Sequence, residues 1–159
     1  MIDFMKEALK EAKKAYEKDE VPIGAVVVYN GKIISRGHNN REKSQNAIKH
    51  AEIIAIEKAC KKLNSWRLDD AEIYVTLEPC PMCAGAIANA RMSKLIYGCR
   101  EKTSGDLLCE SILKSQRLNH KVEINFNDTY SQEISSLLVS FFGNKRKSTL
   151  CTKDKIKRQ

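Results

Sequence analysis

Residues 76–85 constrain the fold of this chain more than any other stretch, because they read Thr-Leu-Glu-Pro-Cys-Pro-Met-Cys-Ala-Gly. Pro81 favours the first position of a helix, where its missing N–H group needs no partner. Cys80 then falls at the helix cap and Cys83 one turn later, so both sulfur atoms face the same side of the helix start. The positive end of the helix dipole lowers the pKa of a thiol and favours the thiolate, the form that binds metal. The stretch therefore predicts two ligands of a metal site.

A third ligand is predicted upstream, in His50-Ala51-Glu52 at the start of a second helix. The chain reads His-x-Glu, then 26 residues, then Pro-Cys-x-x-Cys. This order is the signature of zinc deaminases that act on nucleobases. One histidine and two cysteines make a three-ligand set, and a catalytic zinc keeps its fourth position for water. We therefore expect one Zn²⁺ per subunit, held by His50, Cys80 and Cys83.

The spacing of His50 and Glu52 gives them different roles. Residues two apart on a helix project roughly 200° apart. Both side chains can therefore reach one point only if the metal lies beyond the helix end, near its axis. We expect Glu52 to be a proton carrier rather than a ligand: it takes a proton from water, passes it to the ring nitrogen and later to the departing ammonia.

A closed structural zinc site is the alternative, with its fourth ligand from one of the other cysteines, Cys60, Cys99, Cys109 or Cys151. A lone Cys-x-x-Cys pair would favour that alternative. The His-x-Glu pattern at this spacing and the proline before Cys80 favour the open catalytic site instead. His38 and His120 have no ligand partner at a recognised spacing, so we expect structural roles for both.

Hydrophobic periodicity predicts alternating helices and strands. The predicted helices cover 3–18, 50–63, 81–91 and 106–114, followed by an amphipathic helix around 134–142 that Gly143 ends or weakens. The predicted strands cover 21–29, 32–36, 71–77, 94–97 and 122–126, with a hairpin turn at Asn30-Gly31 and a loop over 37–48. This alternation predicts an α/β fold with three layers, α/β/α, around a five-stranded mixed sheet.

At 159 residues the chain is long enough for a core without disulfide bonds. It has no apolar run that could cross a membrane, and its first residues form a charged amphipathic pattern rather than a signal peptide. We therefore expect a cytoplasmic protein, in which the six cysteines are metal ligands or core residues. We expect a deaminase domain over 1–144 and a basic C-terminal tail over 145–159.

That tail carries six of the eight net positive charges of the chain. Its charged residues are Lys145, Arg146, Lys147, Lys153, Asp154, Lys155, Lys157 and Arg158. Such a run is typical of a solvated, frayed chain end. It is equally typical of a contact with a phosphate backbone, which would make binding depend on salt.

The two motif stretches, together with several others, resemble the TadA-type tRNA adenosine deaminases over most of the chain. The further stretches are Val21-Pro22-Ile23-Gly24-Ala25, Asn39, Tyr97-Gly98-Cys99-Arg100 and Asn119-His120. The resemblance implies the cytidine deaminase-like fold, a homodimer, and conversion of the wobble adenosine in a tRNA anticodon stem-loop to inosine. It also implies that His50, Cys80 and Cys83 bind zinc and that Glu52 is the proton shuttle.

The resemblance further implies the substrate contacts. Asn39 would hydrogen-bond the purine, Ile23 would line the base pocket, and Phe141 and Phe142 would lie near the anticodon loop. Core packing on an amphipathic helix is the alternative for the two phenylalanines. The match weakens at Lys49, where the family often has a small residue. It also weakens over 101–106, where the loop is expected to be shorter. Glu101 keeps the carboxylate of that stretch, and we expect it to be a further substrate contact.

Two other functions remain open at this stage. The first is deamination of a free base or nucleoside, of the guanine or cytosine type, because such enzymes share the zinc motif. The basic tail and the last helix favour tRNA, since an enzyme of free bases needs neither. The second is a non-catalytic RNA-binding or partner subunit of an editing complex, against which the presence of Glu52 argues.

Overall fold

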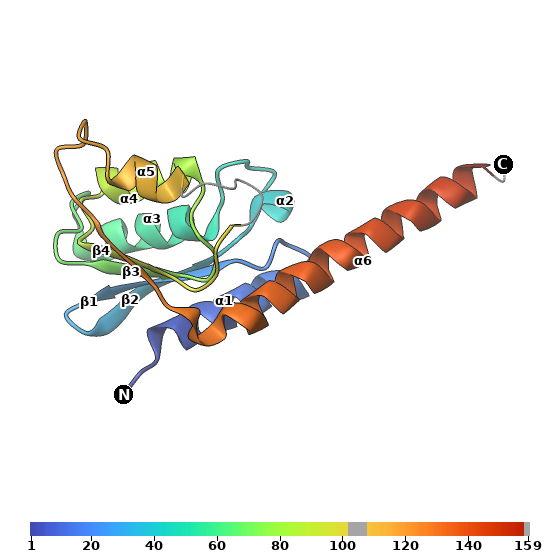
Figure 1. The fold of residues 1–159 in the computed structure, drawn as a ribbon, viewed down its shortest axis with the longest axis horizontal. Coiled ribbons are helices and arrows are strands. Elements are labelled where there is room, and N and C mark those ends of the chain that lie inside the picture. The colour runs from blue at the N-terminus through green and yellow to red at the C-terminus, as the bar shows by residue number, and fades with distance from the viewer. Residues whose placement is uncertain (102–107, 158–159) are drawn as a thin grey trace.

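The computed structural model describes residues 1–101 and 108–157, which form a five-stranded sheet with helices on both faces (Figure 1). The helices are α1 (Phe4–Glu17), α2 (Arg41–Ser44), α3 (Ala51–Leu63), α4 (Pro81–Asn89), α5 (Leu108–Leu113) and α6 (Ser131–Lys157), with a 3₁₀ turn at Asp128–Tyr130. The strands are β1 (Gly24–Tyr29), β2 (Lys32–His38), β3 (Glu72–Val75), β4 (Lys94–Tyr97) and β5 (Glu123–Phe126). The predicted α/β/α architecture is confirmed.

The sheet has the order β2-β1-β3-β4-β5 and mixes both strand directions. β1 is antiparallel to β2 and β3, whereas β3, β4 and β5 run parallel. The β1–β2 turn has positive φ at both Asn30 (49°) and Gly31 (72°), as a two-residue hairpin of this kind requires. Parallel neighbours need a crossover connection, and α4 supplies it between β3 and β4. The metal-binding motif therefore lies where β3 ends.

The helices divide between the two faces of the sheet. α1 and the first part of α6 cover one face, and α3, α4 and α5 cover the other (Figure 1). The largest apolar cluster lies between the sheet and the second group of helices. Its buried members include Val27, Ile73, Val75, Ile87 and Leu95. The core therefore fixes α3 and α4 to the same surface, next to one another.

Close contact between α3 and the sheet depends on Gly37 in β2. A Cβ atom at this position would overlap the carbonyl oxygen of Ala51 and the backbone nitrogen of Ala55. Small side chains on α3 continue this contact, since Ala51, Ala55 and Ala59 are fully buried. The first turn of α3, which carries Glu52, is thereby held at a fixed distance from the sheet.

The last helix is longer than predicted, because α6 continues through Gly143 to Lys157. A glycine inside a helix costs only about 1 kcal/mol, and the neighbouring residues favour helix. Ile134 anchors the first part of α6 in a cluster with Leu9, Ala12 and Cys99. The later part extends away from the rest of the protein (Figure 1). None of the helices in the described ranges combines the length and apolar character that crossing a bilayer requires.

The predicted loop over 37–48 is partly wrong. β2 continues to His38, and residues 41–44 form the short helix α2. Glu20, which is far away in sequence, accepts hydrogen bonds from the backbone N–H groups of Glu42 (3.1 Å) and Lys43 (2.7 Å). This capping contact satisfies the start of α2 and could not be read from the local sequence.

The first strand begins at Gly24 rather than at residue 21, because Ile23 uses its N–H group locally, donating to Val21 O at 2.8 Å. The bounds of the remaining elements agree with the prediction to within two residues. The start of the helix predicted over 106–114 lies outside the described residues, as does most of the 101–106 loop.

Candidate metal centre and catalytic cavity

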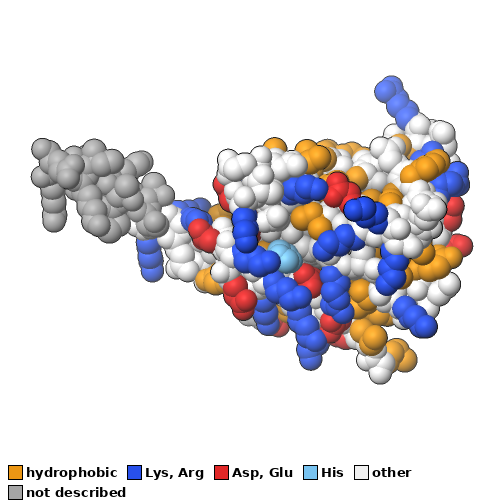
Figure 2. All heavy atoms as spheres, turned by 180° about the vertical axis from the view of Figure 1, so that it is seen from behind, with side chains coloured by type: hydrophobic (Ala, Val, Ile, Leu, Met, Phe, Trp, Pro, Cys, Tyr) orange, Lys and Arg blue, Asp and Glu red, His pale blue; other side chains and the backbone are white. Residues whose placement is uncertain are grey.

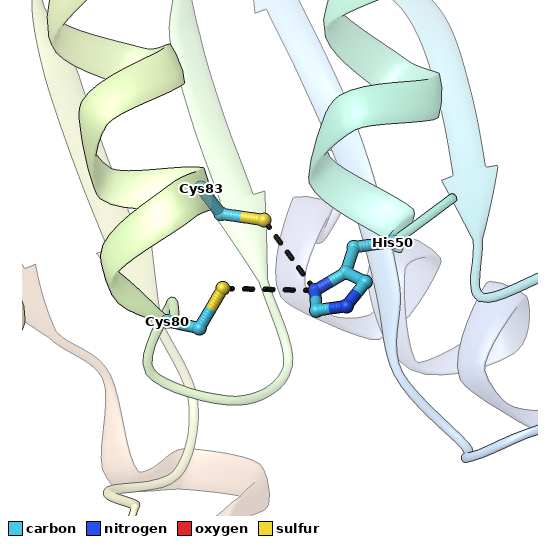
Figure 3. Close-up of side chains that lie close together, drawn as sticks. All are labelled: His50, Cys80 and Cys83. Carbon is cyan, nitrogen blue, oxygen red and sulfur yellow. Dashed lines mark hydrogen bonds between the residues drawn. The ribbon is translucent and has the colours of Figure 1, made fainter. Parts of the chain in front are cut away.

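Three side chains with metal-binding atoms meet where two helices begin. His50 is the N-cap residue of α3, and Cys80 is the N-cap residue of α4, with Pro81 in the first turn. Cys83 follows one turn later on α4. Figure 3 shows the two sulfur atoms and the imidazole ring pointing toward one another. The predicted cap position of Cys80 and the predicted place of His50 at a helix start are confirmed.

The separations of these donor atoms fit a tetrahedral zinc ion. His50 Nδ1 lies 3.6 Å from both Cys80 Sγ and Cys83 Sγ, and all three atoms lie within 4.8 Å of one another. A tetrahedral zinc with bonds of about 2.0 Å to nitrogen and about 2.3 Å to sulfur places these atoms about 3.6 Å apart. The three side chains therefore fit the ion in the positions they already occupy.

The donor set leaves one coordination position open, as a catalytic site requires. Among the residues that the structure describes, the group contains only His50, Cys80 and Cys83. Cys60, Cys99 and Cys109 are free thiols outside it. The side chain of Cys151 lies outside the described part of the chain. A closed four-ligand site is therefore not supported by the described cysteines.

The protonation of the three donors is coupled. A hydrogen bond with Cys83 lowers the pKa of Cys80 to about 4, against the effect of burial and with help from His50. The same hydrogen bond, together with burial, raises the pKa of Cys83. The contact with Cys80 raises the pKa of His50, although burial opposes it. Without metal, the site therefore holds one thiolate beside a thiol and an imidazole that readily binds a proton.

Glu52 is buried beside this group, with only 3% of its surface exposed. Among the residues that the structure describes, its Oε2 atom has no hydrogen-bond partner. Burial raises the pKa of Glu52 to about 7, mainly because the charged form is poorly solvated there. A buried carboxyl group with a free oxygen and a near-neutral pKa is suited to take up and release a proton.

A cavity of about 300 Å³ opens onto this group. Its lining comprises Ile23, His50, Glu52, Leu77, Glu78, Pro79, Cys80, Pro81, Glu101, Leu108 and Cys109. A larger groove of about 700 Å³ shares Ile23, Leu77 and Glu101 with the cavity and continues along α6 to Phe142. The structure therefore brings the predicted contacts Ile23 and Glu101 to the metal centre, and Phe142 to the adjoining groove.

Asn39 lies behind the cavity and supports the first turn of α3. Its Oδ1 accepts the N–H group of Ala51 at 2.8 Å, and its own N–H donates to Ile23 O at 3.2 Å. The carboxamide oxygen is thus used within the protein, whereas the side-chain NH₂ group keeps its donors. The predicted contact of Asn39 with a purine stays a prediction, and the NH₂ group is the part that would make it.

The two phenylalanines of α6 lie in different surroundings. Phe141 is only 7% exposed and packs edge-on against Tyr16, with ring centroids 6.1 Å apart. Phe142 is 46% exposed and lines the groove. Core packing therefore describes Phe141, and Phe142 is the one placed where a substrate could reach it.

Glu78 belongs to the site but was not singled out from the sequence. It is 9% exposed, and its Oε2 accepts the N–H group of Glu101 at 3.2 Å. Its Oε1 has no hydrogen-bond partner within the described ranges, 1–101 and 108–157. Glu78 thereby joins the turn before Cys80 to the segment after β4. An acidic residue directly after a buried strand was the available signal.

His38 and His120 take the structural roles that we predicted. His38 Nδ1 lies 2.9 Å from Glu11 Oε2, and His120 Nε2 donates to the carbonyl oxygen of Met92 at 2.6 Å. Neither belongs to the group of donor atoms around His50.

Comparison with known proteins adds independent information. The family model of the MafB19-like deaminases matches residues 2–146. A tRNA-specific adenosine deaminase of Bacillus subtilis (strain 168) is 50% identical over 147 residues, covering 91% of this chain and 89% of the relative. A solved structure of a tRNA:A34 deaminase, which edits A to I at the wobble position of transfer RNA, is 38% identical with a TM-score of 0.77, covering 85% of this chain and 98% of that one. A guanine deaminase from Bacillus subtilis is 31% identical with a TM-score of 0.61, covering 91% and 92%.

Proposed function

The chain belongs to the MafB19-like deaminase family, and from this premise we propose that it hydrolyses the wobble adenosine of a tRNA anticodon to inosine. One observation carries the proposal: three metal-binding atoms lie together, and a cavity lined by two of their residues, His50 and Cys80, is also lined by the buried Glu52. The greater identity to tRNA deaminases than to a guanine deaminase supports this choice of substrate.

We assign one Zn²⁺ per subunit to His50, Cys80 and Cys83. The ion, when bound, supplies a polarised water, and because two thiolates cancel its charge, that water needs a nearby base. The starts of α3 and α4 hold the three donor atoms in place. The role of the rest of the site is to position the base and to move protons.

Glu52 is the residue that moves the protons during the reaction. Its free Oε2 accepts the proton of the attacking water and delivers it to the ring nitrogen of adenine. It then carries the second proton to the exocyclic amine, which leaves as ammonia. The bond from carbon to the amine nitrogen breaks, and the oxygen of water becomes the carbonyl oxygen of the product base. The pKa of about 7 for Glu52 lies near neutral pH, where proton transfer in both directions is efficient.

The groove beside the cavity supports a polynucleotide substrate. Its walls are mostly apolar, formed by Val21, Ile23 and Leu77 on one side and by Leu138, Val139 and Phe142 of α6 on the other. Arg100 and Arg146 lie on its border. An enzyme of a free base needs only the cavity of about 300 Å³. A groove of more than twice that volume offers room for the neighbouring nucleotides, with Phe142 available for stacking and the arginines for phosphates.

We further propose that the protein acts as a cytoplasmic homodimer on the anticodon stem-loop of tRNA. A native mass twice the 18.0 kDa of one chain is the check on the dimer.

The choice of substrate is tested by ammonia release from a panel of compounds at equal concentration. The panel contains unmodified tRNA, free adenosine, guanine and cytidine. We expect release with tRNA and none with the free compounds. Release from guanine or cytidine, with no inosine formed in tRNA, would favour the alternative function.

A further inference from the structure

A second hollow, of about 450 Å³, shares no lining residue with the catalytic cavity. It is bordered by the end of α1, the end of β2, α2 and α3. Its charged and titratable lining residues are Lys18, His38, Lys43, Lys49, Glu57 and Lys58. We call this site the basic hollow. Figure 2 shows a face of the protein on which lysine and arginine side chains gather around one histidine.

Most of the positive charge in the basic hollow has no paired anion. Lys49 forms an ion pair with Glu57, with Nζ and Oε2 at 2.8 Å. Lys58 Nζ instead donates to a neutral group, the carbonyl oxygen of Arg36, at 3.0 Å. Among the described residues, the side chain of Lys43 has no ion-pair or hydrogen-bond partner.

The ammonium group of Lys18 is held by a neutral partner, so it keeps its positive charge. Its Nζ lies 3.2 Å from His38 Nε2. The carboxylate of Glu11 can only accept, so His38 Nδ1–H donates to it at 2.9 Å, which leaves Nε2 as a neutral acceptor for Lys18. The imidazole therefore orients the ammonium group without neutralising it. Lys18, Lys43 and Lys58 together give the basic hollow three positive charges that repel one another until an anion binds.

The position of the basic hollow indicates which anion it binds. Lys49 lines it, and the next residue in the chain, His50, lines the catalytic cavity. Asn40 N–H donates to Lys49 O at 3.0 Å, and this hydrogen bond joins the two ends of the segment from residue 40 to residue 49. The basic hollow and the catalytic cavity therefore adjoin the same pair of consecutive residues, Lys49 and His50. Each nucleotide of a nucleic acid carries a phosphate beside its base, so one strand can offer a base to the cavity and a phosphate to the basic hollow.

We propose that the basic hollow binds a backbone phosphate of the same RNA whose target base enters the catalytic cavity. This inference rests on the proposed function. The ammonium groups of Lys18, Lys43 and Lys58 form charge-assisted hydrogen bonds with the phosphate oxygens. The contact carries no base information, so it adds affinity and fixes the position of the strand.

The test compares the double variant Lys43→Gln/Lys58→Gln with a matched control, Lys61→Gln/Lys62→Gln. The control removes the same charge from exposed positions on α3, outside the basic hollow. Binding of unmodified tRNA is measured as Kd from low to high salt. We expect Kd to rise about tenfold or more in the first variant, with the slope of log K against log salt reduced by roughly 1. The kinetic loss should fall on KM more than on kcat, and the control should match the wild type.

Equal Kd values and equal salt slopes in the two variants, with unchanged thermal unfolding, would overturn the proposal. A second arm uses inorganic phosphate as a competitor. If the first variant loses inhibition by phosphate but binds tRNA as the wild type does, the basic hollow is a site for small anions and the RNA assignment is wrong. Failure of the wild type to deaminate tRNA would instead contradict the proposed function, and the binding data would still report separately on the basic hollow.

Discussion

At the scale of single residues, the candidate metal centre depends on two helix starts, because His50 caps α3 and Cys80 caps α4. Helix-cap chemistry and the two-residue spacing in His50-Ala51-Glu52 were sufficient to place the ligands at helix ends and to give Glu52 a separate role. The caps at His50 and Cys80 confirm the place of the ligands at helix starts, and the role of Glu52 stays a prediction. The residues that support the ligands could not be predicted from the sequence. The contact of Asn39 Oδ1 with Ala51 N–H and that of Glu78 with Glu101 join segments whose approach only the folded chain reveals.

Zinc uptake should depend on pH because two of the donors must lose protons. The raised pKa values of Cys83 and His50 mean that both bind protons more readily in the metal-free site than in isolation, whereas Cys80 is already a thiolate near neutral pH. Zinc requires a thiolate and a neutral imidazole. We therefore expect zinc affinity to rise about tenfold or more per pH unit between pH 6 and 8, since each released proton contributes one power of ten. Titration with a competing chelator measures it, and an affinity independent of pH would contradict this charge assignment.

At the scale of elements, strands and helices were predicted correctly where hydrophobic periodicity is strong. Errors arose where contacts with residues far away in sequence determine the bounds of an element. α2 depends on its cap by Glu20, and α6 continues past Gly143 to residues that contact the end of α1 and the turn after it, through Asn144 with Tyr16 and Lys145 with Asp19. None of these contacts is visible in the local sequence. The mixed sheet was predictable, since the hairpin at residues 30–31 and the crossover through α4 both have clear sequence patterns.

The packing of α3 on β2 gives a prediction at this scale. Gly37→Ala would push the first turn of α3 away from the sheet, because the new Cβ atom meets backbone atoms that cannot move alone. We expect a loss of roughly 1–3 kcal/mol in the free energy of unfolding, as for other overpacked sites, and reduced activity. Urea denaturation measures the loss. Gly143→Ala is the matched control: nothing lies within 4 Å of its Cβ position, so it should be neutral or stabilise α6. Equal stability of Gly37→Ala and the wild type would refute the close-contact argument.

The contact of α1 with β2 should make stability depend on pH in the acid range. Burial alone would raise the pKa of Glu11, but hydrogen bonds with His38 and Lys14 outweigh it and lower the pKa to about 2. The unfolded value is 4.5. A lowered pKa contributes stability above the unfolded value, and this contribution is lost as pH falls from about 4.5 to about 2. We expect the free energy of unfolding of Glu11→Gln to change between these pH values by roughly 1–3 kcal/mol less than that of the wild type.

Unfolding free energies at pH 5 and pH 2 provide the measurement. Glu17→Gln, an exposed position on the same helix, is the control. An identical pH dependence in the wild type and Glu11→Gln would show that Glu11 contributes nothing in this range.

At the scale of the whole molecule, the chain was expected to divide at residue 145 into a domain and a tail. The prediction of a deaminase domain over 1–144 with a separate basic tail stays a prediction, and α6 runs across this boundary without a break. The anchoring contacts of α6, at Ile134 and Leu138, lie before it. A chain without residues 145–159 should therefore fold.

The tail deletion also distinguishes the two interpretations of its charge. Removing 145–159 takes away six net positive charges. If the tail binds the phosphate backbone, tRNA affinity should fall and the salt slope should decrease by roughly 0.7–0.9 for each phosphate that the tail neutralises. Unchanged affinity and unchanged salt dependence would identify the tail as a solvated end. The variants of the basic hollow provide the comparison, since they leave the tail intact.

We propose that the cavity lined by His50, Glu52 and Cys80, with Cys83 beside them in the donor group, converts the wobble adenosine of tRNA to inosine. The most direct test of this claim is to incubate the purified protein with unmodified tRNA and to sequence the anticodon, in parallel with Glu52→Ala. We predict inosine at the wobble position with the wild type, and a rate lower by about 10²–10⁴-fold with Glu52→Ala while zinc stays bound. An anticodon that keeps its adenosine with the zinc-loaded wild type, or full inosine formation by zinc-bound Glu52→Ala, would contradict the claim.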